Sequence, residues 1–345
     1  METLMADSQD ALVRRLVIPV EGGASTDGDP ANGAATGSIE WLHFDRSHPD
    51  TRALLLTQHD VDNLVVDALL ADETRPRCSV FANGVLLNFR GVNLNPGMQQ
   101  DEMISLRIWV SEGRVISLRK HRIFAVHDVL AELDRQLICT SEYHLVNRLV
   151  WHLTRKIGDS LAPLGEELDE IEEAIISGAN DTLRLRLVEA RRQAIVLRRY
   201  LAPQREALAR WTEVQADREK TVEREQSREN IDTVVRYIED LDSLRDRSSI
   251  VQDTFLALLS DRLNRNMFLL AILSAFFLPL GFITGLLGVN IGGIPGTSWD
   301  WSFVSLCLAL LALCGVQLWV FVKLGWIGRV SAQALTKAGR SHDEI

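Results

Sequence analysis

The sequence lacks most of the features that mark secreted proteins and enzymes. It holds four cysteines, Cys78, Cys139, Cys307 and Cys314, and none of them forms a Cys-x-x-Cys pair. It therefore offers no disulfide framework, which fits a reducing cytosol. The first residues contain no apolar run of the kind that signal peptides carry. No nucleophile–base arrangement, phosphate-binding loop or dinucleotide fingerprint occurs, so nothing predicts an enzyme or a bound cofactor.

Charge is distributed unevenly along the chain. The formal net charge is −10, and acidic residues outnumber basic ones up to Asp261, whereas basic residues are in excess from Arg262 onward. An acidic field repels nucleic acid and attracts cations, but acidity also keeps an ordinary domain soluble. We therefore expect no nucleic-acid partner, and the charge alone leaves cation binding open.

Two long segments carry no charge at all, namely Met267–Val289 and Phe303–Val322. At 1.5 Å per residue, helices of these lengths cross a hydrocarbon core of about 30 Å. A buried helix of a soluble protein normally carries a polar stripe, and these segments have none. We predict two transmembrane helices, 267–289 and 303–322, in contact with membrane lipid.

The distribution of basic residues predicts how these helices cross the membrane. The loop between them, 290–302, contains no Lys or Arg, and Asp300 is its only charge. Basic residues flank the other ends of both segments: Arg262, Arg265, Lys323 and Arg329. The positive-inside rule then places the loop outside and both termini in the cytoplasm, with 323–345 as a cytoplasmic tail. We expect a protein of the bacterial-type inner membrane.

The first part of the chain has mixed α and β character. Residues 1–36 are predicted to be a flexible leader, because Glu21–Ser38 is rich in Gly, Ala, Ser and Asp. Strand-like runs and possible helices follow: strands at Ser38–Phe44, Cys78–Phe89 (with a hairpin at Asn83-Gly84), Met103–Val110 and Arg114–Leu118, and helices at His59–Leu70 and Val126–Cys139. We predict a cytoplasmic α+β or α/β domain over 37–140.

The following region, 141–266, is predicted to be a helical stalk or funnel. Glu142–Ser177 and Asp181–Trp211 are long, charged and periodic, and Gly178-Ala179-Asn180 separates them. Glu219–Asn266 contains no Pro or Gly, and no breaker separates it from the first apolar segment. The pattern predicts one unbroken helix that runs from the cytoplasm through the membrane.

One side of the first apolar segment carries mainly small or polar residues. Steps of three and four residues connect this seam: Asn264, Met267, Ala271, Ser274, Leu278, Gly281, Gly285 and Gly288, with Thr284 beside it. The pattern fits close helix packing. It fits equally well a narrow pore in which Met267 and Leu278 form apolar constrictions that gate by dewetting. Because two helices cannot enclose a water-filled path, such a pore requires an oligomer.

The first apolar segment ends at Gly288-Val289-Asn290, on the predicted outer side. The negative end of the helix dipole and the Asn290 amide oxygen would face an incoming cation there. Neutral oxygens suit an ion that keeps its water shell, whereas direct zinc binding calls for Cys, His or carboxylate ligands. A ring of Asp300 side chains would attract cations, although single carboxylates are common in loops.

Other residues of metal-binding type have a simpler structural interpretation. Cys307 and Cys314 lie on one face of the second apolar segment, but two thiols make an incomplete zinc site. His144 and His152 are two helical turns apart, too far for one shared ion. The acidic run Glu166–Glu173 is typical of a solvated helix face, and a cation-collecting rim of the funnel is the alternative.

The order of these features resembles the CorA-type divalent metal ion transporter superfamily over the whole chain. The shared pattern is a long charged helix, a span containing Leu-Pro-Leu, a Gly-x-Asn triplet, a short loop and a final span. The usual triplet of the family is Gly-Met-Asn, and Val289 replaces Met here. The segment Gly292-Gly293-Ile294-Pro295-Gly296 resembles the ZntB zinc transporter branch more than the magnesium branch.

The resemblance implies a CorA-like, funnel-shaped homopentamer whose first span lines the pore while the second packs outside it. It implies that Gly288, Val289 and Asn290 form the selectivity mouth and that Asn264 lies at the cytoplasmic entrance. It also implies zinc transport linked to protons, in a direction that remains open. One alternative is a magnesium, cobalt or nickel channel of the same architecture. A different class is a two-span membrane scaffold that transports nothing and needs no such seam.

Overall fold

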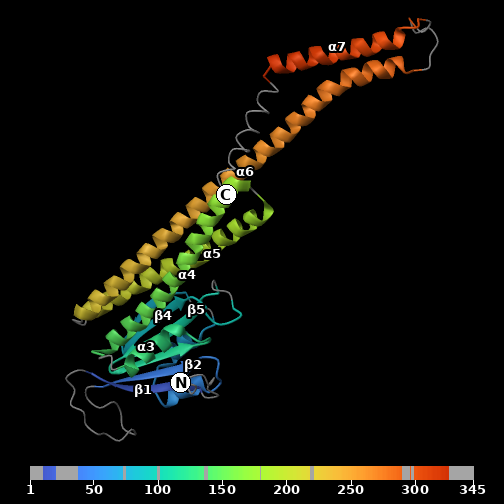
Figure 1. Ribbon diagram of the computed structural model, residues 1–345. Coiled ribbons are helices and arrows are strands. Elements are labelled where there is room, and N and C mark those ends of the chain that lie inside the picture. Colours follow the sequence, from blue (N-terminus) through green and yellow to red (C-terminus); the bar gives the residue numbers. More distant parts are fainter. Residues whose placement is uncertain are drawn as a thin grey trace. The chain divides into compact units, whose positions relative to one another are not determined.

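The computed structural model describes residues 11–20, 38–72, 75–98, 102–135, 139–178, 180–217, 221–289, 296 and 299–325. The chain divides into two units, Met1–Phe255 and Leu256–Ile345. Unit 1 contains a β-sheet and most of the helices, and unit 2 contains the two apolar helical segments (Figure 1).

A six-stranded sheet forms the core of the first half of unit 1. Its strands are β1 (Leu12–Pro19), β2 (Ser38–Asp45), β3 (Arg77–Phe81), β4 (Gly84–Gly91), β5 (Ile104–Ser111) and β6 (Arg114–Arg119). The order across the sheet is β1-β2-β6-β5-β4-β3. Strands β2 and β6 are parallel, and the other neighbours are antiparallel. The predicted hairpin at Asn83-Gly84 is confirmed, because Phe81 pairs with Gly84 across the β3–β4 turn.

Helices cover both faces of this sheet. On one face, α1 (Thr51–Thr57) and α2 (Asn63–Leu70) bury apolar side chains against alternate residues of the strands, such as Leu42 and Ile116. The opposite face packs against the long helix α4 (Glu142–Gly178). There a Cβ added at Gly91 would overlap the Leu153 side chain, so a larger residue would force Leu153 to move. The predicted α+β class is confirmed.

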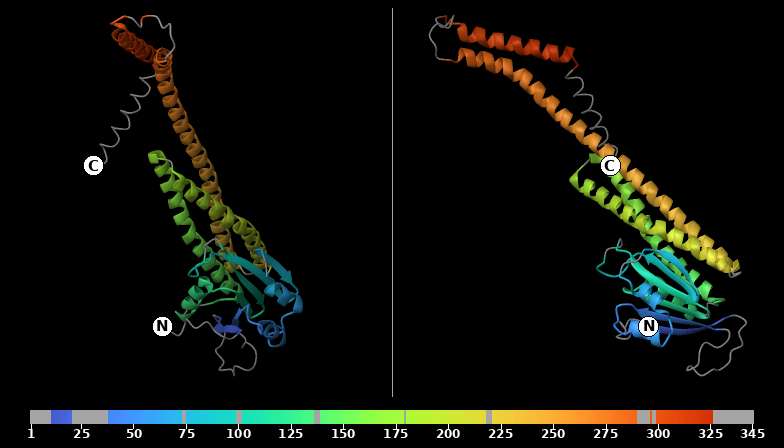
Figure 2. Two further views of the ribbon diagram at one scale, coloured as in Figure 1. Left: turned by 90° about the vertical axis from the view of Figure 1, so that its right-hand side faces the viewer. Right: turned by 180° about the vertical axis from the view of Figure 1, so that it is seen from behind.

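Three long helices extend from the sheet: α4, α5 (Asp181–Asp217) and α6 (Thr221–Leu287). Within unit 1, α4, α5 and the first part of α6 run side by side (Figures 1 and 2). The predicted division near Gly178 is confirmed, as is the unbroken helix that continues into the first apolar segment. A shorter helix, α3 (Phe124–Asp134), packs against α4.

A buried polar network joins these three long helices around Asn147. Its Oδ1 accepts hydrogen bonds from Trp211 Nε1 at 2.9 Å, Gln215 Nε2 at 3.2 Å and Ser227 Oγ at 3.1 Å. Its Nδ2 donates to the backbone oxygen of Glu223 at 2.7 Å. Because buried polar groups are stable only when partnered, this network favours one register of α6 against α4 and α5.

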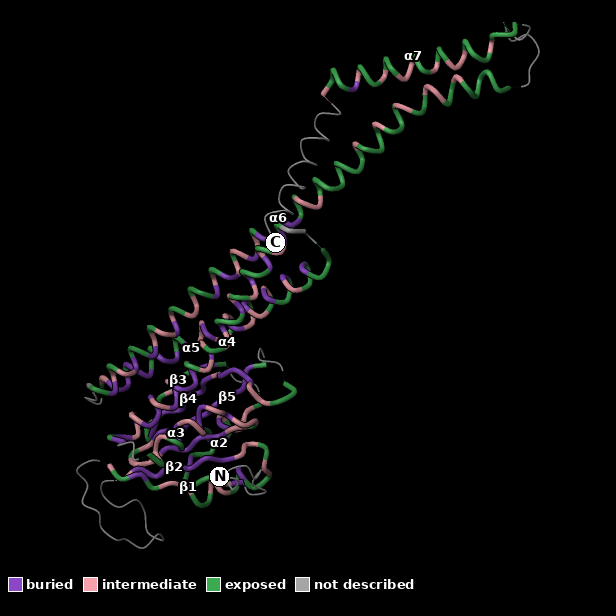
Figure 3. The backbone as a smooth tube through the Cα atoms, viewed as in Figure 1, coloured by how far each residue is buried: buried purple, intermediate pink, exposed green. Residues whose placement is uncertain are grey.

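Unit 2 consists of the last part of α6 and helix α7 (Ser302–Lys323), which run side by side in both views of Figure 2. Both helices are long and apolar enough to cross a membrane. Pro279 lies inside α6 without ending it. Along this part of the chain exposed and half-buried residues predominate, whereas unit 1 has a purple buried core (Figure 3).

Two elements of unit 1 correct the prediction from sequence. Strand β1 was missed and lies inside the segment predicted to be a leader; it is an edge strand with Arg14 and Arg15 exposed, so its alternation is weak. Helix α1 was also missed, because it is only seven residues long. The remainder of the predicted leader, residues 1–10 and 21–36, lies outside the described residues.

Two predicted helices have different ends in the structure. The helix expected from His59 begins only at Asn63, because Asp60 has a positive φ of 53° and Asp62 caps the helix by accepting from the Leu64 N–H at 2.7 Å. The helix expected to reach Cys139 ends at Asp134. Cys139 instead forms an isolated parallel bridge with Val20.

Candidate ion path along the last part of α6

The last part of α6 carries the predicted seam as a continuous exposed strip. The seam residues follow one another at three- or four-residue steps, which places them on one side of a helix. All of them are exposed in the single chain: Asn264, Met267, Ala271, Ser274, Leu278, Gly281, Gly285 and Gly288, with Thr284 beside them. Even the two large apolar side chains are open, with Met267 67% and Leu278 71% exposed.

The other side of the same helical segment is half-buried. Its half-buried residues recur with the same helical spacing: Phe268, Ile272, Phe276, Pro279 and Ile283. Helix α7 runs beside this part of α6 (Figure 2), and its own half-buried residues include Leu310, Leu313 and Gln317. The second apolar helix thus covers one side of the first, and the chain itself leaves the seam uncovered.

Two glycines of the seam, Gly281 and Gly285, are not required by packing against other described residues. A Cβ added at Gly281 or at Gly285 would meet no atom within 4 Å. The hydroxyl of Thr284 bonds back to its own helix, at 3.0 Å from the Leu280 oxygen and 3.2 Å from the Gly281 oxygen. The small side chains therefore leave space beside the helix that no described residue fills.

The end of the seam is only partly described. The Gly288 N–H donates to the Thr284 oxygen at 2.9 Å, and Val289 follows as an exposed residue. The predicted ligand Asn290 and the segment 291–295 lie outside the described residues. Asp300 is exposed between two exposed tryptophans, directly before α7 begins. Its carboxylate is therefore accessible to a cation.

The cysteines and the one amide of α7 share a half-buried side of the helix. Cys307 and Cys314 are free and half-buried there, which favours packing. In the described part of the chain, no group of three or more His, Cys, Asp or Glu side chains could hold a metal ion. Sequence reasoning overlooked Gln317, whose Oε1 is buried and has no hydrogen-bond partner among the described residues. A lone amide in an apolar span was the signal that could have found it.

The acidic run on α4 is engaged by arginines of the neighbouring helices. Arg186 of α5 binds Glu167 at 2.7 Å and Glu170 at 2.7 Å. Arg247 of α6 binds Glu172 at 2.8 Å. The hydrogen bonds from Arg186 lower the pKa of the Glu167 carboxyl. These ion pairs between helices favour the structural interpretation of the run over a cation-collecting rim.

The two histidines of α4 are engaged separately. His152 is buried, with its Nε2 3.0 Å from Glu132 Oε1 and its Nδ1 3.6 Å from Asp128 Oδ2. The His144 ring accepts a hydrogen bond from the Thr140 N–H at 3.3 Å. Burial, and then the charge of Arg148, lower the pKa of His144. The two rings share no ligand, as their spacing predicted.

A soluble domain whose last helix continues into an apolar hairpin is the architecture of a membrane transport protein. The chain belongs to the CorA-like Mg2+ transporter protein family, whose model matches residues 36–323. The divalent cation transporter CmaX of Pseudomonas aeruginosa is 35% identical over 291 residues, which cover 83% of this chain and 87% of that protein. The zinc transport protein ZntB of Yersinia enterocolitica is 30% identical over 281 residues, 81% of this chain and 86% of that protein.

The solved structures include the same fold. The structure of the full-length CmaX protein superimposes with a TM-score of 0.78 at 32% identity and covers 93% of this chain and 100% of that chain. These findings confirm the resemblance seen in the sequence and the two transmembrane helices. Members of this family transport divalent cations and are not enzymes, and this is the function class of the chain.

Proposed function

We propose that this protein transports zinc across the bacterial inner membrane, through a pore on the axis of a homopentamer. The observation that carries the proposal is the seam of α6, which is exposed opposite the side that α7 covers. A two-span chain cannot enclose a water-filled path. Five copies with their seams turned inward would enclose one, while lipid contacts the outer helices and both termini stay in the cytoplasm.

The transported ion keeps its water shell along this path. The seam from Met267 to Gly288 contains no Cys, His or carboxylate, the ligands that bind dehydrated zinc. Its polar atoms are neutral oxygens, such as those of Asn264 and Ser274. Met267 and Leu278 form two apolar constrictions about 16 Å apart along the helix, which close the path by dewetting. Ala271, Gly281, Thr284 and Gly285 line the wider parts: their side chains are small.

Gly288, Val289 and Asn290 form the selectivity mouth at the outer end of α6. Two features attract cations there. The last carbonyl groups of each α6 carry the negative end of its dipole, and Asp300 adds a full negative charge from the outer loop. In a ring of copies these charges act together on the hydrated ion.

Zinc is favoured over other divalent cations by the relative from Yersinia enterocolitica, whose name is zinc transport protein. Coupling to protons would supply the driving force. The second candidate is a magnesium, cobalt or nickel channel of the same architecture. The family description names Mg2+, and a seam of neutral oxygens suits any strongly hydrated divalent ion.

The test is metal uptake by the full-length protein in proteoliposomes, with zinc and magnesium indicators and with or without a pH gradient. Asn290→Ala should lower zinc flux roughly tenfold, because the mouth loses its amide oxygens. The control is Gln252→Ala, which removes an exposed amide from the same helix, before the apolar segment begins. It should leave the flux unchanged. The mass of the purified protein should correspond to five copies.

The outcomes separate the candidates. Zinc flux that rises with the pH gradient and falls in Asn290→Ala supports the proposal. Magnesium flux that ignores the pH gradient favours the channel. A protein that is not pentameric, or that carries neither ion, contradicts the proposed pore.

A further inference from the structure

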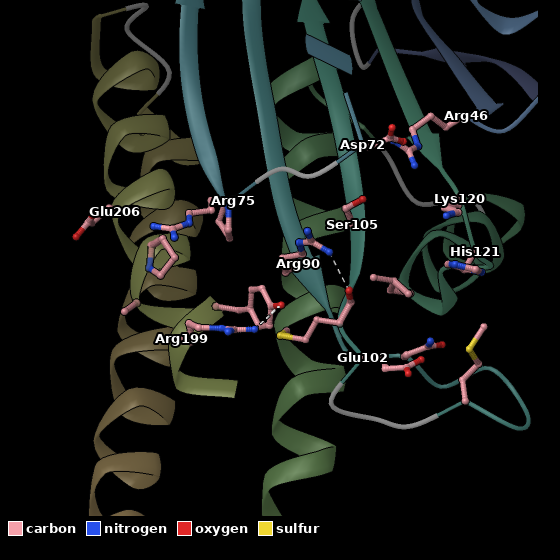
Figure 4. Close-up of a pocket in the computed structure, with 18 residues that line it drawn as sticks. Arg46, Asp72, Arg75, Arg90, Glu102, Ser105, Lys120, His121, Arg199 and Glu206 are labelled. Atoms are coloured by element: carbon pink, nitrogen blue, oxygen red, sulfur yellow. Dashed lines mark hydrogen bonds and ion pairs between the residues drawn. The ribbon is translucent and has the colours of Figure 1, made fainter. Parts of the chain in front are cut away.

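Unit 1 contains a groove with an excess of positive charge. Its volume is about 930 Å³, which lies in the range of small-molecule sites. Five cationic side chains line it (Figure 4): Arg46, Arg75, Arg90, Lys120 and Arg199. Three acidic side chains accompany them among the described residues. The groove is thus a positive region in a chain whose net charge is −10.

The topology of the sheet brings two of these cations together. Strands β2 and β6 are parallel neighbours, and their last residues, Asp45 and Arg119, lie side by side. Arg46 and Lys120 directly follow these strands, and the Arg46 N–H donates to the Arg119 oxygen at 2.8 Å. The carboxyl ends of parallel strands are a common place for ligands to bind in α/β sheets. Both cations are therefore built into the same edge.

One aromatic ring holds two further cations in the groove. The guanidinium carbon of Arg90, near the end of β4, lies 5.4 Å from the centroid of the Tyr200 ring. That of Arg199 lies 5.0 Å from the same centroid. Arg90 also donates to the Met103 oxygen at 2.9 Å. Cation–π contacts of this kind fix the direction of a guanidinium without neutralising its charge.

Three of the five cations have no counter-ion in the part of the chain that the structure describes. Within the described residues, Arg75, Lys120 and Arg199 form no ion pair, and Figure 4 shows the Glu206 carboxylate pointing away from the other labelled side chains. Arg46 lies 3.6 Å from Asp72, whose side chain is fully exposed. The Arg46 guanidinium, whose side chain is only 9% exposed, also donates to the backbone oxygens of Leu70 at 3.2 Å and Ala71 at 2.6 Å, and these neutral acceptors leave its charge in place.

Burial and the positive charge of the groove residues together lower the pKa of a neighbouring arginine, Arg107. Arg107 is buried beside the groove and donates to the backbone oxygen of Leu69. Burial, and then the charges of Arg46, Arg90 and Arg77, lower its pKa to about 10. Two of the three cations that act on it line the groove, so their positive charge extends into the protein as well as into solvent.

The cationic side chains and the apolar lining of the groove together favour an organic anion. A divalent cation would be repelled by the groove, so it is not a station for the transported ion. Guanidinium groups match phosphate oxygens in charge and in hydrogen-bond geometry. Met103, Tyr200 and Pro203 add apolar and aromatic surface to the lining of the groove. We propose that the groove binds a small molecule that carries two or more phosphate groups, such as a nucleoside triphosphate.

The test is calorimetric titration of the full-length protein in a neutral detergent, with ATP, pyrophosphate and orthophosphate as probes. EDTA is present, so that binding cannot arise through a divalent metal and does not depend on transport. ATP and pyrophosphate should bind, and orthophosphate much more weakly. Arg199→Gln and Lys120→Gln should each raise the Kd for ATP about tenfold. Added salt should weaken binding further.

The matched control is Arg184→Gln, which removes an exposed arginine from the same helix, α5, about 22 Å along its axis from Arg199. It should leave the Kd unchanged. Tyr200→Phe should bind normally, and Tyr200→Ala should bind weakly while keeping the helical circular dichroism spectrum. This contrast separates loss of the ring from loss of the fold.

Three results would overturn the assignment. One is no binding of ATP or pyrophosphate at millimolar concentration. Another is an equal loss of affinity in Arg184→Gln and Arg199→Gln, which would indicate unspecific attraction. The third is binding of glycerophosphate as tight as that of pyrophosphate, which would point to the single phosphate of a lipid headgroup. None of these results depends on which metal ion the protein carries.

Discussion

Helix α6 belongs to both units, and its two parts differ in whether their polar side chains are buried. In the part before Phe255, Ser227 and Asn230 are buried and hydrogen-bonded to Asn147 of α4. In the part from Leu256 to Leu287 no residue is buried, and polar residues such as Asn264 and Ser274 are exposed on the seam. The first part completes a core within its own chain. Among the described residues, the second part is covered by α7 on one side only, and in the proposed pore other copies of the chain would cover the seam.

The variant with the largest expected effect fills the exposed seam of α6 with a large side chain. Gly281→Trp places a large ring on the exposed strip, and we expect zinc flux to fall roughly tenfold or more, because the side chain occupies the lumen. The control is Leu273→Trp, at a residue that is 57% exposed but lies off the seam. It should transport normally in the same proteoliposome assay. Equal losses in both variants would mean that the seam does not face a pore.

The second prediction compares how much a buried and an exposed asparagine contribute to the free energy of unfolding. Asn147→Ala leaves the buried donors of Trp211 and Gln215 without their acceptor, and we expect the free energy of unfolding to fall by about 3 kcal/mol. Asn264→Ala, on the exposed seam, should change it by less than about 0.5 kcal/mol. Urea unfolding followed by tryptophan fluorescence measures both. Similar losses would show that the two parts of α6 are stabilised alike.

A third prediction concerns how the stability of unit 1 depends on pH. Burial, and then the charges of Arg119 and His127, lower the pKa of His43 from 6.5 to about 3. Below pH 6.5 the unfolded chain binds a proton that the folded chain does not, so stability falls as the pH falls toward 3. Between pH 7 and pH 5 the free energy of unfolding should drop by about 2 kcal/mol from this group.

Urea unfolding at both pH values measures that drop. The control is His43→Gln, which cannot gain the proton and should lack this share of the pH dependence. The same slope in both proteins would mean that His43 is not the group responsible.

The smallest expected effect comes from the exposed ion pairs between the helices of unit 1. Arg247 lies 2.5 Å from Asp169 and 2.8 Å from Glu172, and its side chain is 38% exposed. Because solvent screens such pairs, Arg247→Gln should lower the free energy of unfolding by only about 0.5 kcal/mol. In about 1 M salt the difference should vanish. A loss that persists in salt would mean that Arg247 acts through packing.

The order of the domains and membrane spans could be predicted from the sequence. The exact ends of helices and strands could be predicted less well. The apolar segments, the breaker at Gly178 and the turn at Asn83-Gly84 are strong local signals, and all are confirmed. Strand β1 was missed because an edge strand need not alternate cleanly. The late start of α2 depends on the cap at Asp62 and the backbone of Asp60, which periodicity does not report.

The two candidate sites, the seam and the groove, also differ in how far the sequence predicts them. The seam of α6 could be read because its residues follow one helix at a fixed spacing. The groove could not, because its cations come from separate strands, loops and helices, and only the sheet order brings Arg46 beside Lys120. Neither Gln317 nor the pairing of Arg186 with Glu167 follows from spacing, since both depend on which helices are neighbours.

The position of the apolar helices after Phe255 also sets the order of events during synthesis. The ribosome completes the sheet and helices α1–α5 before the first apolar segment emerges, and domains tend to fold as units in that order. Yet Ser227 and Asn230, which close the core of unit 1, lie on the same helix as that segment. The nascent chain therefore finishes its soluble domain and offers its first span to the membrane by extending a single helix.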